Sequence, residues 1–446
     1  MAGRISMTLC LFLAAAHAAG AESRKLNVLF LFTDDQRADA VGAFGHPVLR
    51  TPHLDSLVES GFTMNSAYCL GSNVGAVCSP SRNMLLSGRA YFRWEGRFAP
   101  PEPANWPDSM NAAGYETYHH GKKGNTAIEI QKRFEHNKYL ENDQAERRSG
   151  EPGKIIVDDA IEFLAGRDED SKPFFMYLAF ANPHDPRVAA EKYQQLYDRD
   201  SIPLPKNYLP IHPFDNGWMT GRDEALAAWP RSEEEVRQHL FDYYATITAL
   251  DGHIGRLLTA LDEQGLRETT LILFSSDHGL AIGSHGLFGK QNLYECGMRA
   301  PLVFCGPGIE HGRSDALVYL MDLYPTICEL AGADVSGGLD GRSFAKVLRG
   351  ESEVARRNLF LAYEDSQRAI RNRRWKLIRY PLIGRTQLFD LQNDPYETRD
   401  LSNDPAQAGR IDRMLAALAR QQARYGDRTP LTAETLRDER FTPPER

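Results

Sequence analysis

Four short apolar runs, each followed by turn or polar residues, restrict the fold of this chain more than any other feature. Runs that are apolar throughout are typical of parallel strands that are buried on both faces. Polar residues follow three of them: Asp34-Asp35, Asn182-Pro183-His184 and Asp277-His278. The four runs are residues 26–33, 173–180, 269–276 and 301–305.

Helical patterns lie between these runs. Residues 51–57 resemble a helix start with an early proline, and residues 233–263 carry a helical period with one apolar face. Strands that alternate with helices predict an α/β fold in which a mostly parallel sheet is sandwiched by helices. Because open sheets of this kind bind ligands at the carboxyl ends of their strands, the polar residues after the runs are candidate site residues.

The sequence pattern changes near residue 345. Residues 375–380 and 387–391 are typical of strands in a small antiparallel unit, and residues 406–424 of a helix. We therefore expect a larger domain over residues 22–345 and a smaller C-terminal α+β domain over residues 346–446. Polar residues 136–153 and 425–446 are predicted to be a loop and a tail.

Residues 1–21 have the pattern of a signal peptide. Arg4 supplies a small basic region, residues 7–16 form an apolar run too short to span a bilayer, and small residues near positions 16–21 offer cleavage sites. We therefore expect a secreted or periplasmic protein without a membrane span. A buried N-terminal helix is the alternative interpretation.

Composition excludes other classes of protein. The chain has 42% hydrophobic and 25% charged residues, which argues against disorder. Its net charge is −8 and its basic residues are dispersed, so no nucleic-acid partner is expected. Among the cysteines, Cys69, Cys296, Cys305 and Cys328 fit no zinc pattern, and they form either a disulfide or buried free thiols.

The segment Cys78-Ser79-Pro80-Ser81-Arg82 carries the most specific chemical signal. Pro80 suits the first turn of a helix, which would put Cys78 at a helix N-terminus where negative charge is favoured. Arg82 would face the same side and hold an oxyanion or nearby carboxylates. This setting would also activate an unmodified thiolate, and a structural cysteine is the alternative.

The segment resembles the sequence that is oxidised to formylglycine in type I sulfatases, and further motifs follow in the order seen in that family. The resemblance covers residues 26 to 403 and implies an alkaline phosphatase-like fold with the catalytic domain first. It also implies a formylglycine-generating enzyme as maturation partner, and hydrolysis of an organic sulfate ester by one oxygen of the hydrated formylglycine. A carbohydrate ester is the expected substrate. The motifs include Ser87-Gly88-Arg89, Gly121-Lys122, Pro183-His184, Gly283-Ser284-His285-Gly286, Lys290, Tyr294-Glu295 and Arg299-Ala300-Pro301.

The same resemblance implies a cation site and a sulfate site. Carboxylates suit a hard cation, Ca²⁺ or Mg²⁺, which would polarise the sulfate. Its expected ligands are Asp34, Asp35, Asp277, His278 and an oxygen derived from Cys78. The expected catalytic residues are Cys78, Arg82, Lys122, His184 and Lys290; Lys122, His184, His285 and Lys290 are the expected substrate-binding residues. Glu295 and Arg299 are expected to pair and brace the pocket.

One position departs from the family. Sulfatases have a histidine two residues after the Gly-Lys lysine, where this chain has Gly124. His119, His120 or Lys123 could replace that histidine.

The sequence is also compatible with two other functions, and it offers several candidate substrate contacts. A phosphonate or phosphate monoester hydrolase uses the same nucleophile and fold, and a non-catalytic homologue would only bind sulfated glycans. Candidate sugar contacts lie in the loop of residues 185–232, which follows no motif of the family. The alternative is that these residues are merely solvated loop residues. They are Arg187, His212, Asp215 and Arg222.

Overall fold

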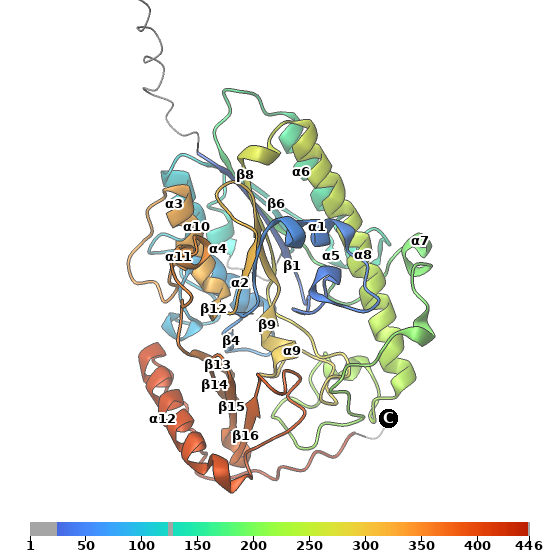
Figure 1. The fold of residues 1–446 in the computed structure, drawn as a ribbon, viewed down its shortest axis with the longest axis vertical. Helices are drawn as coiled ribbons and strands as arrows, with labels where there is room; N and C mark the ends of the chain where they lie inside the picture. Colours follow the sequence, from blue (N-terminus) through green and yellow to red (C-terminus); the bar gives the residue numbers. More distant parts are fainter. Residues whose placement is uncertain (1–24, 124–127, 445–446) are drawn as a thin grey trace, which may run out of the picture.

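A sheet of eight strands forms the centre of the molecule (Figure 1). The computed structural model describes residues 25–123 and 128–444. The central strand β1 lies between β7 and β8 and is parallel to both, whereas β10 runs antiparallel to β8. In spatial order the strands are β11 (Gly312–Ser314), β2 (Phe62–Met64), β10 (Leu302–Cys305), β8 (Thr270–Ser276), β1 (Asn27–Thr33), β7 (Phe174–Ala179), β5 (Glu116–Gly121) and β6 (His136–Tyr139).

Helices cover both faces of this sheet because the side chains of β1 alternate between two apolar cores. Phe30 and Phe32 belong to one core and Leu29 and Leu31 to the other. The prediction of a mostly parallel sheet sandwiched by helices is therefore confirmed. The first core is shared with α2 (Cys78–Ser87), α3 (Trp106–Ala112) and α10 (Leu323–Ala331), and the second with α1 (Pro52–Ser60), α6 (Lys154–Ala165) and α8 (Glu233–Glu263).

The predicted strands and the long helix agree with the structure, but one loop prediction was wrong. Residues 136–153 contain the edge strand β6 and the helix α5 (Asp143–Arg148). β6 pairs only with β5 and keeps exposed or half-exposed side chains, so its sequence shows no apolar run. Polar residues of this segment therefore lie on the strand β6 and the helix α5.

A second, five-stranded sheet follows residue 345, as expected for the smaller unit. The sequence did not predict the strands β13 (Leu359–Tyr363) and β14 (Gln367–Arg371) of this sheet. The short strand β4, just before α2 in the chain, also belongs to it and pairs in parallel with β13. The division at residue 345 stays a prediction. In spatial order the strands are β16 (Arg385–Asp390), β15 (Trp375–Tyr380), β14 (Gln367–Arg371), β13 (Leu359–Tyr363) and β4 (Gly71–Ser72), and α12 (Ala408–Tyr425) packs against them.

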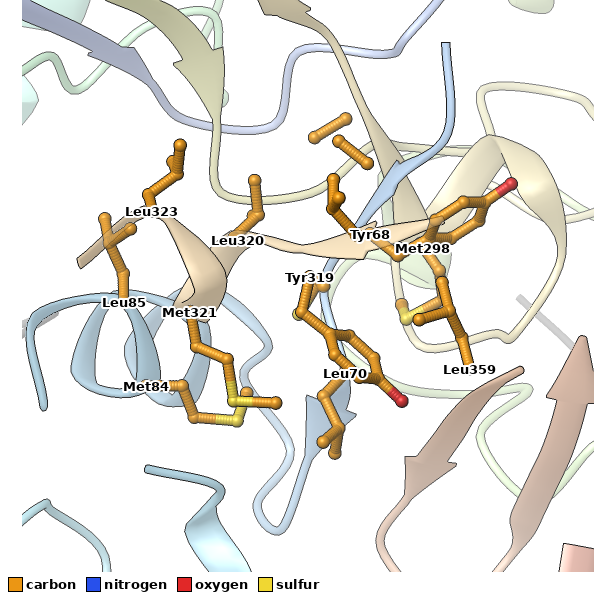
Figure 2. Packing of buried hydrophobic residues seen from close by; sticks show 14 of the residues in the cluster. Tyr68, Leu70, Met84, Leu85, Met298, Tyr319, Leu320, Met321, Leu323 and Leu359 are labelled. Atoms are coloured by element: carbon orange, nitrogen blue, oxygen red, sulfur yellow. The ribbon is translucent and has the colours of Figure 1, made fainter. Parts of the chain in front are cut away.

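Apolar packing holds α2 in place. Figure 2 shows Met84 and Leu85 of this helix beside Met321 and Leu323 of the segment that contains the 3₁₀ helix η6 (Leu320–Asp322). That segment continues from a small sheet of β12 (Val318–Tyr319), β3 (Ala67–Tyr68) and β9 (Arg299–Ala300). Because every residue of α2 is buried, the helix has a fixed position and its first residue, Cys78, is fixed with it.

Three sequence predictions concern export and cysteines. The predicted signal peptide lies outside the described residues. Within the described part of the chain, no helix is both long and apolar enough to cross a membrane. The structure has free thiols at Cys69, Cys296, Cys305 and Cys328. Three of them are buried, as in the second of the two alternatives, and Cys296 is half-buried.

The remaining short elements are α4 (Ile128–Gln131), α7 (Glu191–Gln194), α9 (Glu295–Met298), α11 (Ala345–Leu348), η1 (Gly42–Phe44), η2 (Tyr91–Arg93), η3 (Arg199–Ser201), η4 (Glu224–Leu226), η5 (Arg267–Thr269), η7 (Pro381–Ile383) and η8 (Pro405–Gln407).

Candidate active site

The candidate site lies at the carboxyl edge of the large sheet, where the N-terminus of α2 meets the ends of β1 and β8. Asp34 and Asp35 follow β1, and Asp277 and His278 follow β8. Two sets of side chains have ligand atoms within 4.8 Å of one another, and Cys78 belongs to both. The sets are Asp34, Asp35, Cys78 and His184, and Cys78, Asp277 and His278.

Cys78 is the centre of this cluster. Its Sγ lies 3.0 Å from Lys290 Nζ, 3.2 Å from His278 Nε2 and 3.3 Å from Asp34 Oδ1. Burial, together with the charge of Asp34, raises the pKa of the Cys78 thiol well above its usual range. Burial and the surrounding carboxylates therefore oppose ionisation of an unmodified thiol at this position.

Arg82 holds two of the carboxylates apart and in place. Its Nε donates to Asp277 Oδ2 and its Nη2 to Asp34 Oδ2, each at 3.1 Å, and all three side chains are buried. The expectation that Arg82 faces the cluster is confirmed, and its partners are the carboxylates. Removing one member of such a buried pair would leave an uncompensated charge.

Asp35 turns into the cluster through a left-handed backbone conformation. Its φ is 69°, its N–H donates to Asp277 Oδ1 at 3.0 Å, and its carbonyl accepts from Tyr243 at 2.7 Å. Burial raises the pKa of Asp35, since Lys290 offsets only part of the penalty. Burial also opposes ionisation of Asp34, but Lys122 and further cations hold its pKa well below the usual range.

His278 presents one nitrogen to the cluster. Its Nδ1 lies 2.9 Å from the carbonyl oxygen of Gly279, which can only accept, so Nδ1 carries the proton. Nε2, which carries no proton when the ring is neutral, lies 3.6 Å from Asp35 and 3.6 Å from Asp277. This tautomer is the one that a metal-binding imidazole requires.

The two predicted sulfate-binding lysines both reach the cluster. Lys122, just after β5, lies 3.0 Å from Asp34 Oδ2, and Lys290 lies 2.8 Å from Asp35 Oδ1. Although burial disfavours a charged ammonium, Asp35 and Cys78 raise the pKa of Lys290 well above its usual range. The site therefore holds fixed cations beside its nucleophile candidate.

His184 lies at the edge of the cluster, with Nε2 3.9 Å from Asp35 Oδ2. Burial and the two lysines lower the pKa of His184 well below its usual range, so the ring is neutral. Its Nδ1 lies 2.7 Å from the carbonyl oxygen of Asp185 and 3.1 Å from Nη1 of Arg147. Arg147, on α5, was missed because its segment was predicted to be a loop.

Other predicted residues lie elsewhere. His285 stacks on Tyr294 with ring centroids 3.8 Å apart, and its Nε2 lies 2.9 Å from the amide nitrogen of Asn207. This ring braces a loop, and the structure does not bring it to Cys78. His119 lies beside Asn137 and His120 beside Asp159, at 2.8 and 3.1 Å, so neither is brought to Cys78. Gly124 lies outside the described residues, and Lys123 is exposed.

Some of the candidate sugar contacts lie near the site and others do not. His212 is buried between Phe214 and Tyr294, Arg187 donates to the Pro183 carbonyl, and Asp215 accepts from the Gly217 N–H. Arg222 approaches the site because it pairs with both Asp185 and Asp223. Arg187 also approaches it, since the carbonyl that it contacts precedes His184 and its charge acts on Asp185. Asp223, which sequence reasoning missed, is buried 3.9 Å from Lys290 Nζ and accepts from Gln291.

Glu295 does brace the molecule, and the charge of Arg299 acts on it as expected, but its hydrogen-bond partners are other residues. It accepts from Lys376 at 3.1 Å and from the Tyr68 hydroxyl, and Arg371 lies 3.4 Å away. Glu397 shares Lys376 at 2.9 Å. These groups join α9 to the C-terminal sheet, and we call Glu295, Glu397, Lys376, Arg371 and Tyr68 the bracing cluster.

Comparisons with known proteins agree with this geometry. Residues 26–333 match the sulfatase family, and residues 283–424 match the C-terminal part of N-sulphoglucosamine sulphohydrolase. The chain is 28% identical to an ulvan-active sulfatase of Formosa agariphila, covering 91% of this chain and 83% of the relative. It is 26% identical to an N-acetylglucosamine-6-O-sulfatase of Bacteroides thetaiotaomicron, covering 93% and 89%.

Solved structures show the same fold. A protein in complex with its substrate D-glucosamine-2-N,6-O-disulfate superposes with a TM-score of 0.76 at 23% identity, covering 92% of this chain and 100% of that protein. The phosphonate monoester hydrolase of Silicibacter pomeroyi reaches 0.74 at 22% identity, covering 93% and 99%. Since the family match spans more than half of the chain, this protein belongs to the sulfatase family of the alkaline phosphatase-like superfamily and is a sulfuric ester hydrolase.

Proposed function

We propose that this sulfatase hydrolyses a carbohydrate sulfate ester, with Cys78 converted to formylglycine by a formylglycine-generating enzyme. The observation that carries the proposal is the convergence of Lys290, His278 and Asp34 on the buried Sγ of Cys78, each within 3.3 Å. A thiol with a raised pKa is a poor nucleophile here, whereas a hydrated aldehyde supplies an oxygen nucleophile at the same position. The carbohydrate substrate is supported by the relatives named for ulvan and N-acetylglucosamine 6-sulfate.

The donor set fits a hard divalent cation. Asp34, Asp35 and Asp277 offer buried carboxylate oxygens, and the lone pair of His278 Nε2 faces them. Oxygen ligands suit Ca²⁺ and also Mg²⁺, and the nitrogen of His278 is a softer but acceptable addition. Such a cation, when bound, would polarise the sulfate ester.

The remaining side chains have separate tasks in this proposal. Arg82 fixes Asp34 and Asp277 in position, while Lys122 and Lys290 neutralise charge on the sulfate oxygens as the ester bond breaks. His184 is the candidate proton donor to the leaving oxygen, because its Nε2 faces the cluster. Donation needs the proton on Nε2; Arg147, which can only donate to Nδ1, favours this tautomer, whereas the Asp185 carbonyl, 2.7 Å from Nδ1, opposes it.

Mass spectrometry of the tryptic peptide that contains Cys78 tests the nucleophile. The protein should be produced in a host that has a formylglycine-generating system, with a known sulfatase as control. We expect an aldehyde in place of the thiol. A thiol that stays unmodified while the control is converted would contradict the proposal.

Turnover then tests the reaction. We expect 4-nitrophenyl sulfate to be hydrolysed with a higher kcat/KM than the corresponding aryl phosphonate. The opposite preference would favour a phosphonate monoester hydrolase, an activity that structurally similar proteins have. Release of sulfate from N-acetylglucosamine 6-sulfate and other sulfated sugars would then identify the carbohydrate. The expected export rests on the sequence of residues 1–21 alone.

A further inference from the structure

An open cleft of about 660 Å³ has Asn73, five residues before the first residue of α2, in its lining. It is formed by the residues after β4, by η2, by the turn between β13 and β14 and by the segment after α12. We call it the aromatic cleft, and the lining residues that matter here are Asn73, Phe92, Trp94, Glu364, Asp365 and Arg428. Its size is that of a small-molecule binding site.

One short loop separates the aromatic cleft from Cys78. Asn73 lines the cleft, and five residues further along the chain is Cys78, so the two Cα atoms are at most about 18 Å apart. The carbonyl of Gly75, inside this loop, accepts from Gln291 at 3.1 Å and from Tyr363 at 3.2 Å. These two residues adjoin Lys290 and Glu364, so the loop contacts neighbours of both the site and the cleft.

Two carboxylates of the cleft have no counter-charge. Across residues 25–123 and 128–444, neither Glu364 nor Asp365 forms an ion pair. Their neighbours Arg368 and Asp427 instead neutralise each other through hydrogen bonds of 2.7 and 3.1 Å. Arg428, exposed on the rim, likewise forms no ion pair within the part of the chain that the structure describes. The cleft therefore has more unpaired negative than positive charge.

The position of Glu364 is fixed by the backbone. Its N–H donates to the Ser72 carbonyl at 2.7 Å, its own carbonyl accepts from Arg368 at 2.6 Å, and its φ is 40°. Its carboxylate is half-buried without a partner. A free acceptor held on a fixed backbone is suited to a ligand that donates hydrogen bonds.

Aromatic rings form another part of the lining. Phe92 packs against Tyr91 with ring centroids 4.3 Å apart, and Trp94 packs edge-on against Tyr91. Trp94 is 9% exposed, and its Nε1 has no hydrogen-bond partner in the described part of the chain. Tyr91 and Trp94 are buried, so the half-buried ring of Phe92 is the aromatic surface that can pack on the C–H face of a sugar while its hydroxyls are bound.

We propose that the aromatic cleft binds the sugar next to the sulfated unit, and that Glu364 and Asp365 select a sugar that donates hydrogen bonds, through hydroxyl or ammonium groups, over an acidic one. This inference rests on the proposed function, because it places the sulfate of the same substrate at Cys78. A uronic acid or a second sulfate in the cleft would face two unpaired carboxylates.

The test measures binding without turnover. In a Cys78→Ala protein, calorimetry gives the Kd of three sulfated disaccharides that differ only in the second sugar: a neutral hexose, a hexosamine with a free amine, and a uronic acid. We expect the first two to bind about tenfold more tightly than the third, from repulsion of the acidic sugar. A hexosamine preference that weakens with salt identifies the ammonium as the recognised group, and equal binding of hexose and hexosamine identifies the hydroxyls.

A double variant, Glu364→Gln with Asp365→Asn, isolates the carboxylates. The discrimination against the uronic acid should fall to less than about twofold, while the paired change Glu310→Gln with Asp334→Asn, two exposed carboxylates elsewhere, should leave it intact. In the Cys78-containing enzyme, the double variant should keep its kcat/KM for 4-nitrophenyl sulfate, which has no second sugar.

Unchanged discrimination in the double variant, or equal binding of all three disaccharides by the parent, would overturn the inference. So would an equal loss of activity on 4-nitrophenyl sulfate and on the disaccharides. Lack of any sulfatase turnover would count against the proposed function. The Kd ratios in the Cys78→Ala protein test the sugar preference of the cleft separately.

Discussion

Two buried ion clusters of similar composition have different roles in this molecule. The cluster at Cys78 contains Asp34, Asp35 and Asp277 with Arg82, Lys122 and Lys290, and the bracing cluster pairs Glu295 and Glu397 with Lys376 and Arg371. Both lie in the interior, where an unpaired charge is costly. Buried salt bridges alone therefore do not identify an active site.

The difference lies in what the charges surround. The bracing cluster joins strands β14 and β15 to α9, and its hydrogen bonds connect protein groups to one another. The cluster at Cys78 stands on loops that follow strands, converges on a sulfur atom and brings ligand atoms within 4.8 Å of one another. Changes in the first should reduce stability, and changes in the second should reduce activity.

The largest effect is expected for Cys78→Ala. Loss of the nucleophile should lower kcat for 4-nitrophenyl sulfate by about 10³-fold or more, with the fold retained, since alanine fills most of the same space. Cys328→Ala, which changes a buried thiol elsewhere, should leave kcat unchanged. Comparable activity of the two variants would place the nucleophile at another residue.

Asp277→Asn should reduce both activity and cation binding. The change removes a ligand candidate and leaves Arg82 with one carboxylate instead of two, so turnover should fall by about 10²-fold or more. Titration with Ca²⁺, followed by calorimetry, should show weaker binding than in the parent protein. Asp39→Asn, a change in a carboxylate outside the cluster, is the matched control. Unchanged Ca²⁺ affinity would exclude Asp277 as a ligand.

Lys376→Met should show the opposite pattern. It leaves Glu295 and Glu397 without their shared cation, which should lower the free energy of unfolding by about 3–5 kcal/mol. Urea unfolding measures this loss. The kcat of the remaining folded enzyme, measured under stabilising conditions, should stay close to that of the parent. A selective loss of kcat without a loss of stability would show that the bracing cluster takes part in catalysis.

The bracing cluster also predicts a pH dependence of stability. Burial opposes ionisation of Glu295, but Arg371 and Lys376 outweigh it and lower its pKa to about 2, from 4.5. A lowered pKa stabilises the folded state above pH 4.5, and this contribution of Glu295 is lost as the pH falls towards 2. Burial raises the pKa of its neighbour Glu397 to about 7, which acts in the opposite sense between pH 7 and pH 4.5. Urea unfolding between pH 4.5 and pH 3 should therefore show a smaller acid-induced loss for Glu295→Gln than for the parent. Parallel curves would contradict the prediction.

The smallest expected effect is stabilisation by the cation. Ca²⁺ at about 100 times its Kd should raise the free energy of unfolding by about 2.7 kcal/mol, because the folded state alone presents the ligands together. Chelation should reverse the increase. At the same Ca²⁺ concentration, the response should persist in Lys376→Met and be smaller in Asp277→Asn, so it distinguishes the two clusters. A response that Asp277→Asn retains in full would place the cation elsewhere.

Local patterns in the sequence were sufficient for the scaffold of the site. The apolar runs that end at Asp34 and Asp277 predicted β1 and β8, and Pro80 predicted a helix that begins near Cys78. These features depend on neighbours in the chain, because a buried strand needs apolar residues and a first helical turn accepts proline. The edge strand β6 has no such pattern, so Arg147 was missed with it.

What the sequence by itself determined was the order of motifs, the family and the candidate residues for the chemistry. Only the tertiary structure decided which charges meet: that His285 lies against Tyr294, that Asp223 stands near Lys290, and that Glu295 pairs with Lys376. Such contacts join residues far apart in the chain, and their energies depend on burial and distance, which no local pattern contains. The same reason places Glu364, nearly three hundred residues after Cys78 in the chain, on the wall of the neighbouring cleft.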